Sequence, residues 1–524
     1  MRARRWGIRV AIHSAVALVT TFPLAIHLGD RIPIGQEPSA TVPFFNLWSL
    51  TWTSQRLPHL LHGWWDAPIF WPSHGTYASS ELQPLTGLGF AVLRLAVGPA
   101  AAYGLLLLGA LVLDGLAAGA LARRLGASEG ASIAAGVLAQ TVPFVFEQLG
   151  VLQLLMLWPV LLTLERLLAW AASGRLVHAA GIGLGVAVTY LTCGYFAVLI
   201  VLCALVASPL LVQRSWLADW RHRLLGVAVA GAGALPLVPF ALGQQHRLAD
   251  VRWTDATIRL NSSSWSDLAP GGSDFAGFAL LALAIVGVVA GRHRPATRFL
   301  LGLALVATVV ALGLRLEIAG WRPYGVLVDH VSAFGHLRSP FRATALAQVS
   351  LAVLAALGID ALWSGPSRTL GPAAVGVALV LAVATTDLGP GHLVAPPDRD
   401  TPWISWLSAH PGGAVVALPP APGPDEEDFE ATTAAMVQSL EHGHPLVNGY
   451  SAFFPSRDEV LRDRLDAFPT DAILRKLRRE HVSYAVADAG WWDADRADAA
   501  RALGVRTILT DRDVVLLDLR PNPR

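Results

Sequence analysis

Charged residues are scarce in this chain of 524 residues: they make up 15% of it, while hydrophobic residues make up 54%. A soluble globular domain typically carries about 25% charged residues, so the chain as a whole is not an ordinary water-soluble unit. The same figures exclude a disordered chain, which needs low hydrophobicity and high net charge. A net charge of +1 gives no bulk attraction for nucleic acid, which is therefore not an expected partner. The composition indicates a membrane protein.

Cysteine and the common nucleotide and metal motifs are also nearly or wholly missing. The two cysteines, Cys193 and Cys203, both lie in apolar runs, which disfavours a disulfide framework and a cysteine metal site. The sequence contains no GxxxxGK[ST] motif, no GxGxxG between a strand and a helix, and no HExxH. Transport driven by intracellular ATP is therefore not expected of this chain alone. No cofactor is predicted, and a divalent metal has no support in the sequence.

Long apolar runs fill the first 390 or so residues, and a run of about 20 residues is long enough to cross a bilayer as a helix. The run 177–213 is too long for one crossing, and Thr192-Cys193-Gly194 divides it. The run 84–97 is too short to span and is expected to be interfacial or re-entrant. About eleven transmembrane helices are predicted, near residues 8–28, 99–122, 130–147, 151–171, 177–191, 194–213, 222–243, 274–291, 297–316, 342–363 and 370–388.

Arginines gather in the short joints between alternate spans, and positive charge near span ends marks the cytoplasmic side. The first apolar run follows a basic segment and lacks a clear cleavage site, which is typical of an uncleaved signal anchor. Lysine occurs once, as Lys476, and this preference for arginine suggests bacterial high-GC coding. We therefore expect a multi-pass protein of the bacterial inner (plasma) membrane with a cytoplasmic N-terminus. The joints that then lie outside are 29–98, 244–273, 317–341 and the tail from 389.

The tail from about residue 396 is charged and lacks long apolar runs. Its short apolar runs between turn residues are typical of strands, and the charged segments 456–480 and 493–503 have a helical pattern. We expect a transmembrane domain over 1–390, including the first outer loop with its interfacial helices, and a small C-terminal α/β domain over 396–524 outside the cytoplasm. The predicted strands cover residues 414–418, 484–487, 505–509 and 514–517.

The first outer loop, residues 29–98, is rich in aromatic and acidic residues. Tryptophans suit the lipid headgroup layer, where they serve as anchors or guide a lipid-linked substrate. A carboxylate at the mouth of a membrane cavity can act as general base on an acceptor hydroxyl, although each acid can equally be a solvated loop charge. The tryptophans in question are Trp48, Trp52, Trp64, Trp65 and Trp71, and the acids are Asp30, Glu37, Asp66 and Glu81.

Polar residues near other outer turns are further candidates. Arg338 and Arg342, in the segment Gly335–Arg342 with His336, stand four residues apart before a span, where they can clamp a phosphate or simply snorkel to the interface. Polar residues at an outer turn, here Glu147, Gln148 and Gln153, usually face a cavity rather than lipid. Asp114 lies inside a span, which makes it a functional candidate unless it pairs with Arg123 or a neighbouring helix.

With these segments in view, nearly the whole chain resembles a bacterial family of multi-spanning proteins of the GT-C glycosyltransferase type, related to the YfhO-like membrane proteins. The order and spacing of several short motifs carry the resemblance. These motifs are Asn46-Leu47-Trp48, Leu121-Ala122-Arg123-Arg124-Leu125, Gln148-Leu149-Gly150-Val151-Leu152-Gln153, Cys193-Gly194-Tyr195-Phe196-Ala197, Leu337-Arg338-Ser339-Pro340-Phe341-Arg342 and Pro445-Leu446-Val447-Asn448-Gly449-Tyr450-Ser451-Ala452-Phe453-Phe454-Pro455.

The resemblance implies an inverting transferase that takes a sugar from a polyprenyl-phosphate donor at the outer face and passes it to a glycan or lipid acceptor. An acid of the first outer loop then serves as the base, for which Glu37 and Glu81 are the candidates, and Arg338 and Arg342 stabilise the departing lipid phosphate. The implied partners are membrane lipid, the lipid-linked donor and the acceptor. The remaining predicted substrate-binding residues are His336, Gln153, Glu147, Trp48 and Asp66.

The chain departs from the family pattern at two presumptive site positions. Val42 stands where relatives carry the acid of a Gly-Asp-Pro element, and Val151 replaces the histidine of a Gly-His-x-Gln element. Glu81 does match a family acid. An inactive GT-C protein that binds lipid-linked glycans or supports envelope assembly is therefore the alternative hypothesis. A secondary transporter ranks third, because Asp114 is its one candidate for an ionisable group near the midplane.

Overall fold

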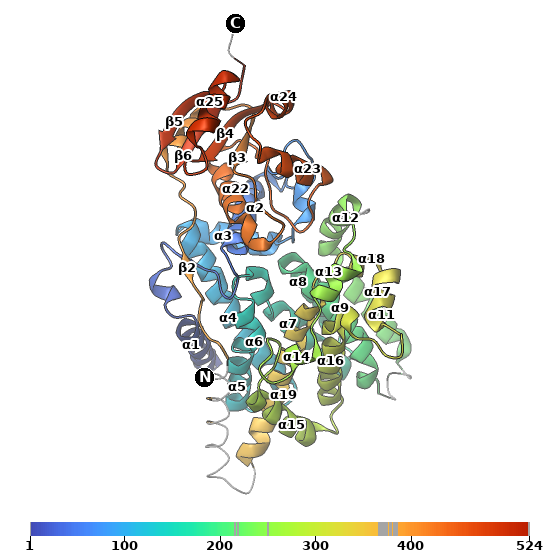
Figure 1. The fold of residues 1–524 in the computed structure, drawn as a ribbon. Coiled ribbons are helices and arrows are strands. Elements are labelled where there is room, and N and C mark those ends of the chain that lie inside the picture. Colours follow the sequence, from blue (N-terminus) through green and yellow to red (C-terminus); the bar gives the residue numbers. More distant parts are fainter. Residues whose placement is uncertain are drawn as a thin grey trace. The chain divides into compact units, whose positions relative to one another are not determined.

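The computed structural model describes residues 2–213, 216, 219–248, 251–364, 376, 380 and 386–521. The chain folds as two compact units, each built from segments that are distant in sequence (Figure 1). Unit 1 comprises Met1–His27, Gly104–Leu242 and Ala249–His392, and unit 2 comprises Leu28–Tyr103, Gly243–Leu248 and Leu393–Arg524.

The regular elements of unit 1 are all helices within the part of the chain that the structure describes. Its longer helices are α1 (Arg2–Thr20), α4 (Pro99–Arg124, which begins in unit 2), α5 (Glu129–Gln140), α7 (Trp158–Ser173), α8 (Leu176–Thr192), α9 (Gly194–Ala207), α11 (Trp220–Gly233), α12 (Val238–Arg247, which ends in unit 2), α15 (Phe278–Gly291), α16 (Pro295–Ala311) and α19 (Thr344–Ser364). Its short helices are α6 (Pro143–Glu147), α13 (Asp255–Leu260), α14 (Trp265–Leu268), α17 (Pro323–His330) and α18 (Ser332–Gly335).

Among the described residues, six helices are long and apolar enough to cross a membrane. Three shorter apolar helices, α8, α15 and α16, accompany them, and the chain is a multi-pass membrane protein. The number of eleven spans stays a prediction, because the predicted span 370–388 lies mostly outside the described residues. The six helices are Pro99–Arg124, Glu129–Glu147, Leu152–Ser173, Gly194–Leu211, Trp220–Arg247 and Pro340–Ser364.

The predicted division of the run 177–213 is confirmed. Helix α8 ends at Thr192, Cys193 has an extended backbone, and α9 begins at Gly194. A second break, within the predicted span 130–147, separates α5 from α6 at Pro143. Proline lacks the N–H that a continuous helix needs and is favoured in the first turn of the helix that follows.

Glycines let the helices of unit 1 approach closely. A Cβ atom at Gly287 of α15 would collide with the backbone carbonyl of Leu354 in α19, and one at Gly358 of α19 would collide with the carbonyl of Leu283. Lipid is as apolar as leucine, so membrane helices associate through close packing, which small residues permit. The α15–α19 pair is therefore held by direct contact between the two backbones.

Unit 2 contains a four-stranded sheet with the order β3-β4-β6-β5, in which β3 pairs parallel to β4 and the other pairs are antiparallel (Figure 1). The strands coincide with the four apolar runs noted in the sequence. They are β3 (Ala414–Leu418), β4 (Val482–Asp488), β5 (Arg506–Asp511) and β6 (Val514–Asp518), and the surrounding helices of the tail are α21 (Pro402–Ala409), α22 (Glu430–His442), α23 (Ser456–Leu465), α24 (Asp471–Arg479) and α25 (Ala494–Ala502).

One predicted helix of the tail is in fact two. The charged segment 456–480 breaks between α23 and α24, where Pro469 lies. The residue before a proline is disfavoured in the helical conformation, and the proline itself has no N–H to donate. Buried side chains from both helices, including Leu461 and Leu477, pack with Val416 of β3 and Leu517 of β6 in one hydrophobic core.

The first outer loop belongs to the same compact unit as the tail, a grouping that the sequence did not indicate. It supplies α2 (Thr41–Arg56) and α3 (Pro84–Arg94), and α2 packs against α22. Strand β1 (Ile32–Pro33) pairs antiparallel with β2 (Leu393–Val394). At the start of α2 the Ala40 N–H donates to Glu430 Oε2 at 3.1 Å, so a tail carboxylate caps the helix.

Candidate functional site

Three residues from two segments of unit 1 form an arginine–tyrosine cluster: Tyr195, and Arg338 with Arg342. The Arg342 guanidinium carbon lies 4.1 Å from the centre of the Tyr195 ring, and the backbone N–H of Arg338 donates to Tyr195 Oη at 3.0 Å. Arg342 is only 9% exposed. Tyr195 stands in the first turn of α9, and Arg342 stands in the short helix Pro340–Ala343 that leads into α19.

Aromatic and cationic neighbours extend this cluster. The Arg338 guanidinium carbon lies 5.4 Å from the centre of the Trp253 ring. The backbone N–H of Trp253 donates to the Gly335 carbonyl at 3.0 Å. A Cβ atom at Gly335 would lie 2.7 Å from Arg252 Nε, so the Arg252 side chain packs directly on this glycine. Arg252 in turn donates to the Val328 carbonyl. His336, predicted to bind substrate, is half-buried in the same segment.

Tyr324 of α17 is 2% exposed and packs edge-to-face on Phe334, with ring centres 5.8 Å apart. Burial raises the pKa of the Tyr324 hydroxyl, which also interacts electrostatically with Tyr195, so it stays protonated at neutral pH and can donate a hydrogen bond. Guanidinium groups donate hydrogen bonds and do not accept them. Flat aromatic faces stabilise a half-buried guanidinium group. A donor-rich group of this kind suits an anion such as a phosphate or a carboxylate.

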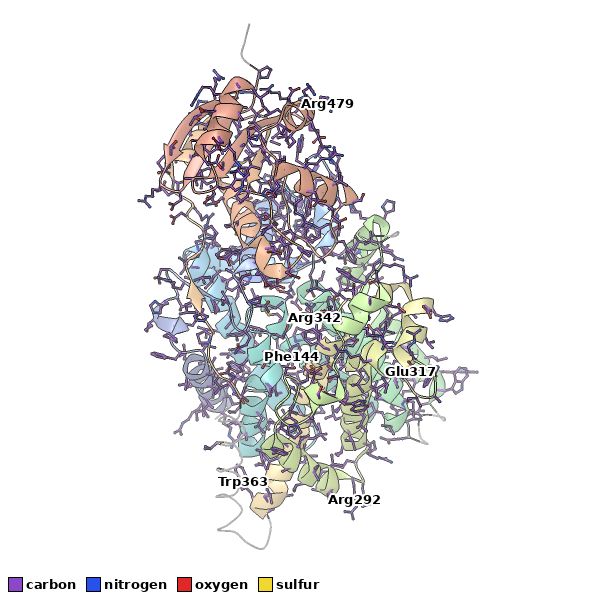
Figure 2. All side chains as sticks on the ribbon, in the orientation of Figure 1. Phe144, Arg292, Glu317, Arg342, Trp363 and Arg479 are labelled. Atoms are coloured by element: carbon purple, nitrogen blue, oxygen red, sulfur yellow. The ribbon has the colours of Figure 1, made fainter. Side chains whose placement is uncertain are left out.

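The cluster and the arginines of the short joints lie apart in unit 1. In Figure 2, Arg342 is well separated from Arg292 and Trp363, which lie where α15 ends and where α19 ends. The sequence predicts that Arg292 faces the cytoplasm and Arg342 the outside. Their separation fits that prediction, and the side on which each lies stays a prediction.

Acidic and amide groups near α6 form a second polar region of unit 1. Glu147 lies within electrostatic reach of Asp274 and Asp387. Asp274 accepts a hydrogen bond from Ser263 Oγ at 2.6 Å. Gln348 of α19 bridges the region, because its Oε1 accepts from the Phe144 N–H at 3.0 Å and its Nε2 donates to the Asp274 carbonyl at 3.1 Å. Within the described part of the chain, no three His, Cys, Asp or Glu residues are grouped so that they could hold a metal ion.

Gln153 and Asp114 lie elsewhere in unit 1. Gln153 lies in the short helix Leu152–Leu155 and is 5% exposed. Its predicted role in binding substrate stays a prediction. Asp114 is 0% exposed, and no hydrogen-bond partner of its two carboxylate oxygens is found in the part of the chain that the structure describes. The backbone N–H groups that act on it electrostatically are those of Leu157 and Trp158, at the start of α7. The functional role of Asp114 and the transporter hypothesis both stay predictions.

The two predicted base candidates lie in unit 2. Glu37 is half-buried and lies within electrostatic reach of the Tyr103 hydroxyl. Glu81 is also half-buried and stands two residues before Gln83. Gln83 Nε2 donates to Asn46 Oδ1 of α2 at 2.8 Å, and both side chains are buried. This hydrogen bond fixes the segment that carries Glu81 to α2, the helix that Glu37 precedes.

Trp48 is a core residue of unit 2. It is 0% exposed and packs beside Tyr77, with ring centres 5.8 Å apart. The Tyr77 hydroxyl bonds to Ser49 Oγ at 2.5 Å, and Trp64, 1% exposed, donates from Nε1 to Thr53 Oγ1 at 3.1 Å. Trp48 and Trp64 therefore pack inside protein, so neither indole is exposed as a lipid anchor would be, and their position in the headgroup layer and the role of Trp48 in binding substrate stay predictions.

Asp66 closes a surface loop of unit 2. Its Oδ1 accepts from the Gly75 N–H at 2.8 Å and lies 3.6 Å from His74 Nδ1, and its side chain is 56% exposed. Gly75 has a left-handed backbone, with φ of 67°, as a tight turn requires. The carboxylate stabilises this turn, and its predicted contact with substrate stays a prediction.

The predicted site residues therefore divide between the units. Unit 1 holds Arg338, Arg342, His336, Gln153 and Glu147, and unit 2 holds Glu37, Glu81, Trp48 and Asp66. Sequence reasoning gave no role to Tyr195 or Trp253, which contact the arginines. The sequence did contain a signal for Tyr195. It belongs to the motif Cys193-Gly194-Tyr195-Phe196-Ala197, which directly follows the helix break and begins α9. Trp253 has no comparable signal, because it is far from Arg338 in the sequence and the two residues meet only in the folded chain.

No protein-family model matches this sequence, and no curated protein is significantly similar to it. Solved structures do match over nearly all of the chain. Arabinofuranosyltransferase AftD from Mycobacteria matches with a TM-score of 0.66 and 16% identity, over 99% of this chain and 40% of that one. ArnT from Cupriavidus metallidurans matches with a TM-score of 0.56 and 14% identity, over 100% of both chains. The Archaeoglobus fulgidus oligosaccharyltransferase, solved with Zn and sulfate, matches with a TM-score of 0.50 and 13% identity, over 95% of this chain and 70% of that one.

These identities are low, so the likeness concerns the fold. The chain covers 40% of the length of AftD, so the activity of that whole protein is not carried over. The resemblance noted in the sequence motifs is confirmed at the level of the fold by structures that share few residues with this chain. The chain has the GT-C membrane glycosyltransferase fold.

Proposed function

We propose that this protein is a membrane glycosyltransferase that uses a polyprenyl-phosphate sugar as donor. The observation that carries the proposal is the arginine–tyrosine cluster, in which the Arg342 guanidinium group lies over the Tyr195 ring and the backbone of Arg338 donates to the hydroxyl of the same tyrosine. Two guanidinium groups can bind a phosphate with paired, charge-assisted hydrogen bonds. The fold and the membrane spans support the same class of protein.

The proposed reaction divides between an acid and the arginines. An acceptor hydroxyl attacks the anomeric carbon and gives its proton to Glu37 or Glu81. The bond between the anomeric carbon and the phosphate oxygen breaks, and its electron pair leaves with the polyprenyl phosphate. Arg338 and Arg342 stabilise the negative charge that develops on this leaving group. The attack comes from the face opposite to the phosphate, so the configuration at the anomeric carbon inverts.

Binding of the donor phosphate is tested without turnover. Purified protein is mixed with undecaprenyl phosphate or, as the matched ligand without charge, undecaprenol, and the bound lipid is measured by native mass spectrometry. We expect Arg342→Gln to weaken phosphate binding by roughly 10–100-fold, since a hydrogen bond to a charged group contributes about 1.5–3 kcal/mol. Tyr195→Leu, which removes the aromatic face, is expected to weaken it by less.

Arg292→Gln is the control, because Arg292 is an exposed arginine of a short joint. It is expected to leave lipid binding unchanged. Equal binding of the phosphate and the alcohol by the wild-type protein would contradict a phosphate site. The proposal also fails if Glu37→Gln, Glu81→Gln and Arg338→Ala each leave the cell-surface glycan unaltered in the native host.

Val42 and Val151 favour a second candidate, a GT-C protein that binds lipid-linked glycans without transferring them. Val42 lies in the first turn of α2, and Val151, 6% exposed, precedes the short helix Leu152–Leu155. Neither side chain can exchange a proton. This candidate predicts the same lipid binding with no turnover by the wild-type protein, and a gain of glycan transfer by Val42→Asp would mark a decayed enzyme.

A further inference from the structure

The backbone that leads to Glu81 is bound by a glutamine from another segment of unit 2. Gln244, in the last turn of α12, donates from Nε2 to the carbonyl oxygens of Ala78 and Ser80, each at 3.1 Å. A side-chain amide nitrogen has two N–H groups, so one glutamine can serve both carbonyl groups at once. Gln244 is half-buried, and Ala78 and Ser80 are buried, so both hydrogen bonds are partly shielded from water.

The tail binds the same stretch of backbone. The N–H of Ala452 donates to the Ser79 carbonyl at 3.2 Å, and Ser451 Oγ lies within hydrogen-bond distance of Ser80 Oγ, at 3.3 Å. Three consecutive carbonyl groups directly before Glu81, those of residues 78–80, therefore accept hydrogen bonds from α12 and from the tail.

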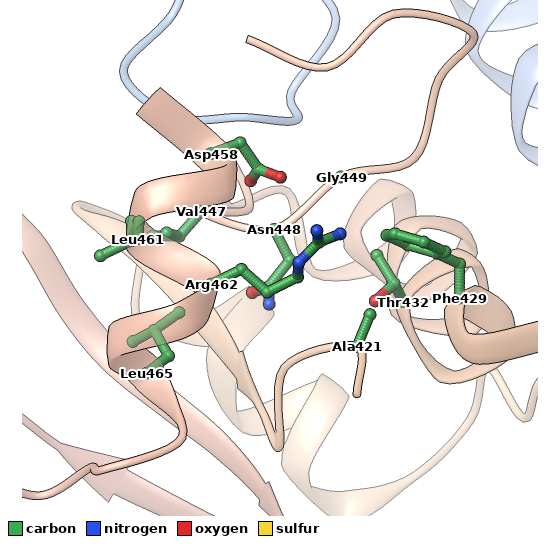
Figure 3. Close-up of a pocket in the computed structure, with 10 residues that line it drawn as sticks. All are labelled: Ala421, Phe429, Thr432, Val447, Asn448, Gly449, Asp458, Leu461, Arg462 and Leu465. Carbon is green, nitrogen blue, oxygen red and sulfur yellow. The ribbon is translucent and has the colours of Figure 1, made fainter. Parts of the chain in front are cut away.

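The tail segment that makes these contacts is itself fixed. Asn448 Oδ1 accepts from the Ala417 N–H at 2.7 Å, and its Nδ2 donates to the Ala417 carbonyl at 3.0 Å. The Asn448 carbonyl accepts from the Phe70 N–H at 3.2 Å. Figure 3 shows Asn448 at a pocket that Asp458 and Arg462 of α23 also line, and this pocket has room for about one water molecule. The segment is thus tied to β3 and to the first outer loop.

The end of α12 packs on the first outer loop independently of the Gln244 side chain. A Cβ atom at Gly243 would lie 2.6 Å from Trp65 Cζ2, so the indole packs directly on this glycine. The Arg247 guanidinium carbon lies 4.8 Å from the centre of the Trp65 ring, and a Cβ atom at Gly75 would lie 3.2 Å from Arg247 Cδ. Removal of the Gln244 amide therefore leaves the contacts that dock this helix end in place.

The backbone is also held after Glu81. Gln83 Nε2 donates to Asn46 Oδ1 at 2.8 Å. Glu81 thus stands between two stretches of backbone that different partners hold. A general base must lie within hydrogen-bond reach of the proton that it takes, and a displacement of about 1 Å can cost roughly 100-fold in rate.

We propose that Gln244 is a positioning residue of the transferase. It holds the backbone of residues 78–80 so that the Glu81 carboxylate stays where it takes the proton of the acceptor hydroxyl. Gln244 itself touches neither the acceptor nor the donor. The inference rests on the proposed function and takes Glu81 as the base, and its consequence is a loss of transfer without a loss of donor binding.

The test measures the initial rate of glycan formation in isolated membranes of the native host, which supply their own lipid-linked donor and acceptor. Gln244→Met keeps nearly the shape of the side chain but removes both N–H donors. We expect it to lower the rate roughly 10–100-fold, and to leave binding of undecaprenyl phosphate, measured by native mass spectrometry, within about twofold of the wild type. Hydrogen exchange of the backbone amides of residues 77–81 should become faster.

Two further variants separate the hydrogen bonds from a merely structural role. Gln244→Lys changes the shape of the side chain but keeps N–H donors for both carbonyl groups, so we expect it to retain most of the rate. Gln438→Met is the matched control, because Gln438 is a half-buried glutamine of unit 2 whose Nε2 donates to the Asp398 carbonyl at 3.1 Å. It should have the wild-type rate, and thermal unfolding verifies that every variant is folded.

The outcomes distinguish this inference from the proposed function. If Glu81→Gln keeps the wild-type rate, the base assignment fails and the inference fails with it. If Glu81→Gln loses the rate and Gln244→Met keeps it, the inference alone is overturned. It is also overturned if Gln244→Lys loses as much rate as Gln244→Met, or if Gln244→Met loses lipid binding together with the rate.

Discussion

The two units of this protein differ in how their interiors are held and in the charge of their candidate groups. Unit 1 packs apolar helices through backbone contact, as at Gly287 and Gly358, and carries the arginine–tyrosine cluster. Unit 2 buries a network of hydroxyl, amide and indole groups around α2 and carries the half-buried acids Glu37 and Glu81. The arginines of the proposed reaction thus belong to unit 1 and its acids to unit 2, and the two units differ in packing.

This difference reflects two ways of stabilising a helix pair. Between lipid-facing helices the hydrophobic effect supplies little driving force, so the helix pair is stabilised by close approach and dispersion contacts. In unit 2 the buried polar groups must find partners, and each satisfied hydrogen bond fixes one side chain against another. Substitutions should therefore act through shape in unit 1 and through hydrogen bonds and charge in unit 2.

The largest expected effect is in unit 1. Gly287→Leu forces a side chain into the carbonyl of Leu354, where neither backbone can yield without separating α15 from α19. We expect a loss of at least about 3 kcal/mol of stability and little folded protein, as measured by size exclusion and thermal unfolding in detergent. Gly109→Leu in α4 is the control, since a Cβ there meets nothing within 4 Å. Equal losses in both variants would contradict backbone contact as the cause.

The matching substitution in unit 2, Tyr77→Phe, removes one buried hydroxyl group. Tyr77→Phe keeps the buried ring but removes the hydroxyl that bonds to Ser49 Oγ at 2.5 Å and to Thr53 Oγ1 at 3.2 Å, and Thr53 Oγ1 then keeps its hydrogen bond from Trp64 Nε1. We expect a cost of about 1–3 kcal/mol, because buried polar groups lose their hydrogen bonds. Ser54→Ala, whose half-exposed hydroxyl donates to the Thr51 carbonyl of its own helix, should cost much less. Tryptophan fluorescence during urea unfolding measures both variants.

A pH-dependent effect is expected at Asp458, whose pKa rises from 3.8 to about 7 on folding because of burial. The unfolded chain loses this proton first, so the folded state loses stability as the pH rises from about 4 to about 7. Asp458→Asn should therefore stabilise the protein at pH 8 by roughly 1–2 kcal/mol, less than the full pKa difference implies because the group is partly hydrated. The gain should vanish near pH 4.

The opposing groups near Asp458 are Arg462, which lowers its pKa, and Glu459, which raises it. Asp463→Asn on the exposed side of the same helix should change the melting temperature equally at both pH values. A pH-independent gain for Asp458→Asn would show that its charge is not the cause.

The smallest expected effect concerns the contact between the loop and the tail within unit 2. Glu430→Gln removes the negative charge that caps the start of α2 through the Ala40 N–H. We expect a loss of about 0.5–1 kcal/mol, reduced by added salt, because the interaction of a carboxylate with a helix N-terminus is screened. Glu427→Gln, an exposed neighbour, serves as the control. A salt-independent loss would point to packing instead.

Much of the local structure could be predicted because its signal is local. The helix break at Cys193 and the strand at Ala414–Leu418 follow from the length and spacing of apolar residues along a few turns or alternations. Asp114 could be recognised as unusual but not assigned, because the groups that act on it electrostatically, the N–H groups of Leu157 and Trp158, belong to another helix. The burial of Trp48 could not be predicted, since an indole in a protein core and an indole in an interface have the same local sequence.

The sequence by itself determined the membrane class, the main apolar helices, the strands of the tail and the pair Arg338 and Arg342, because hydropathy and charge act over short stretches of chain. Only the tertiary structure decided that residues 28–103 pack with the tail, that Tyr195 lies against both arginines, and that Asp458 and Arg462 face a pocket. Such contacts join residues far apart in sequence. They form only when burial of apolar surface and hydrogen bonding outweigh the entropy lost in closing the intervening chain.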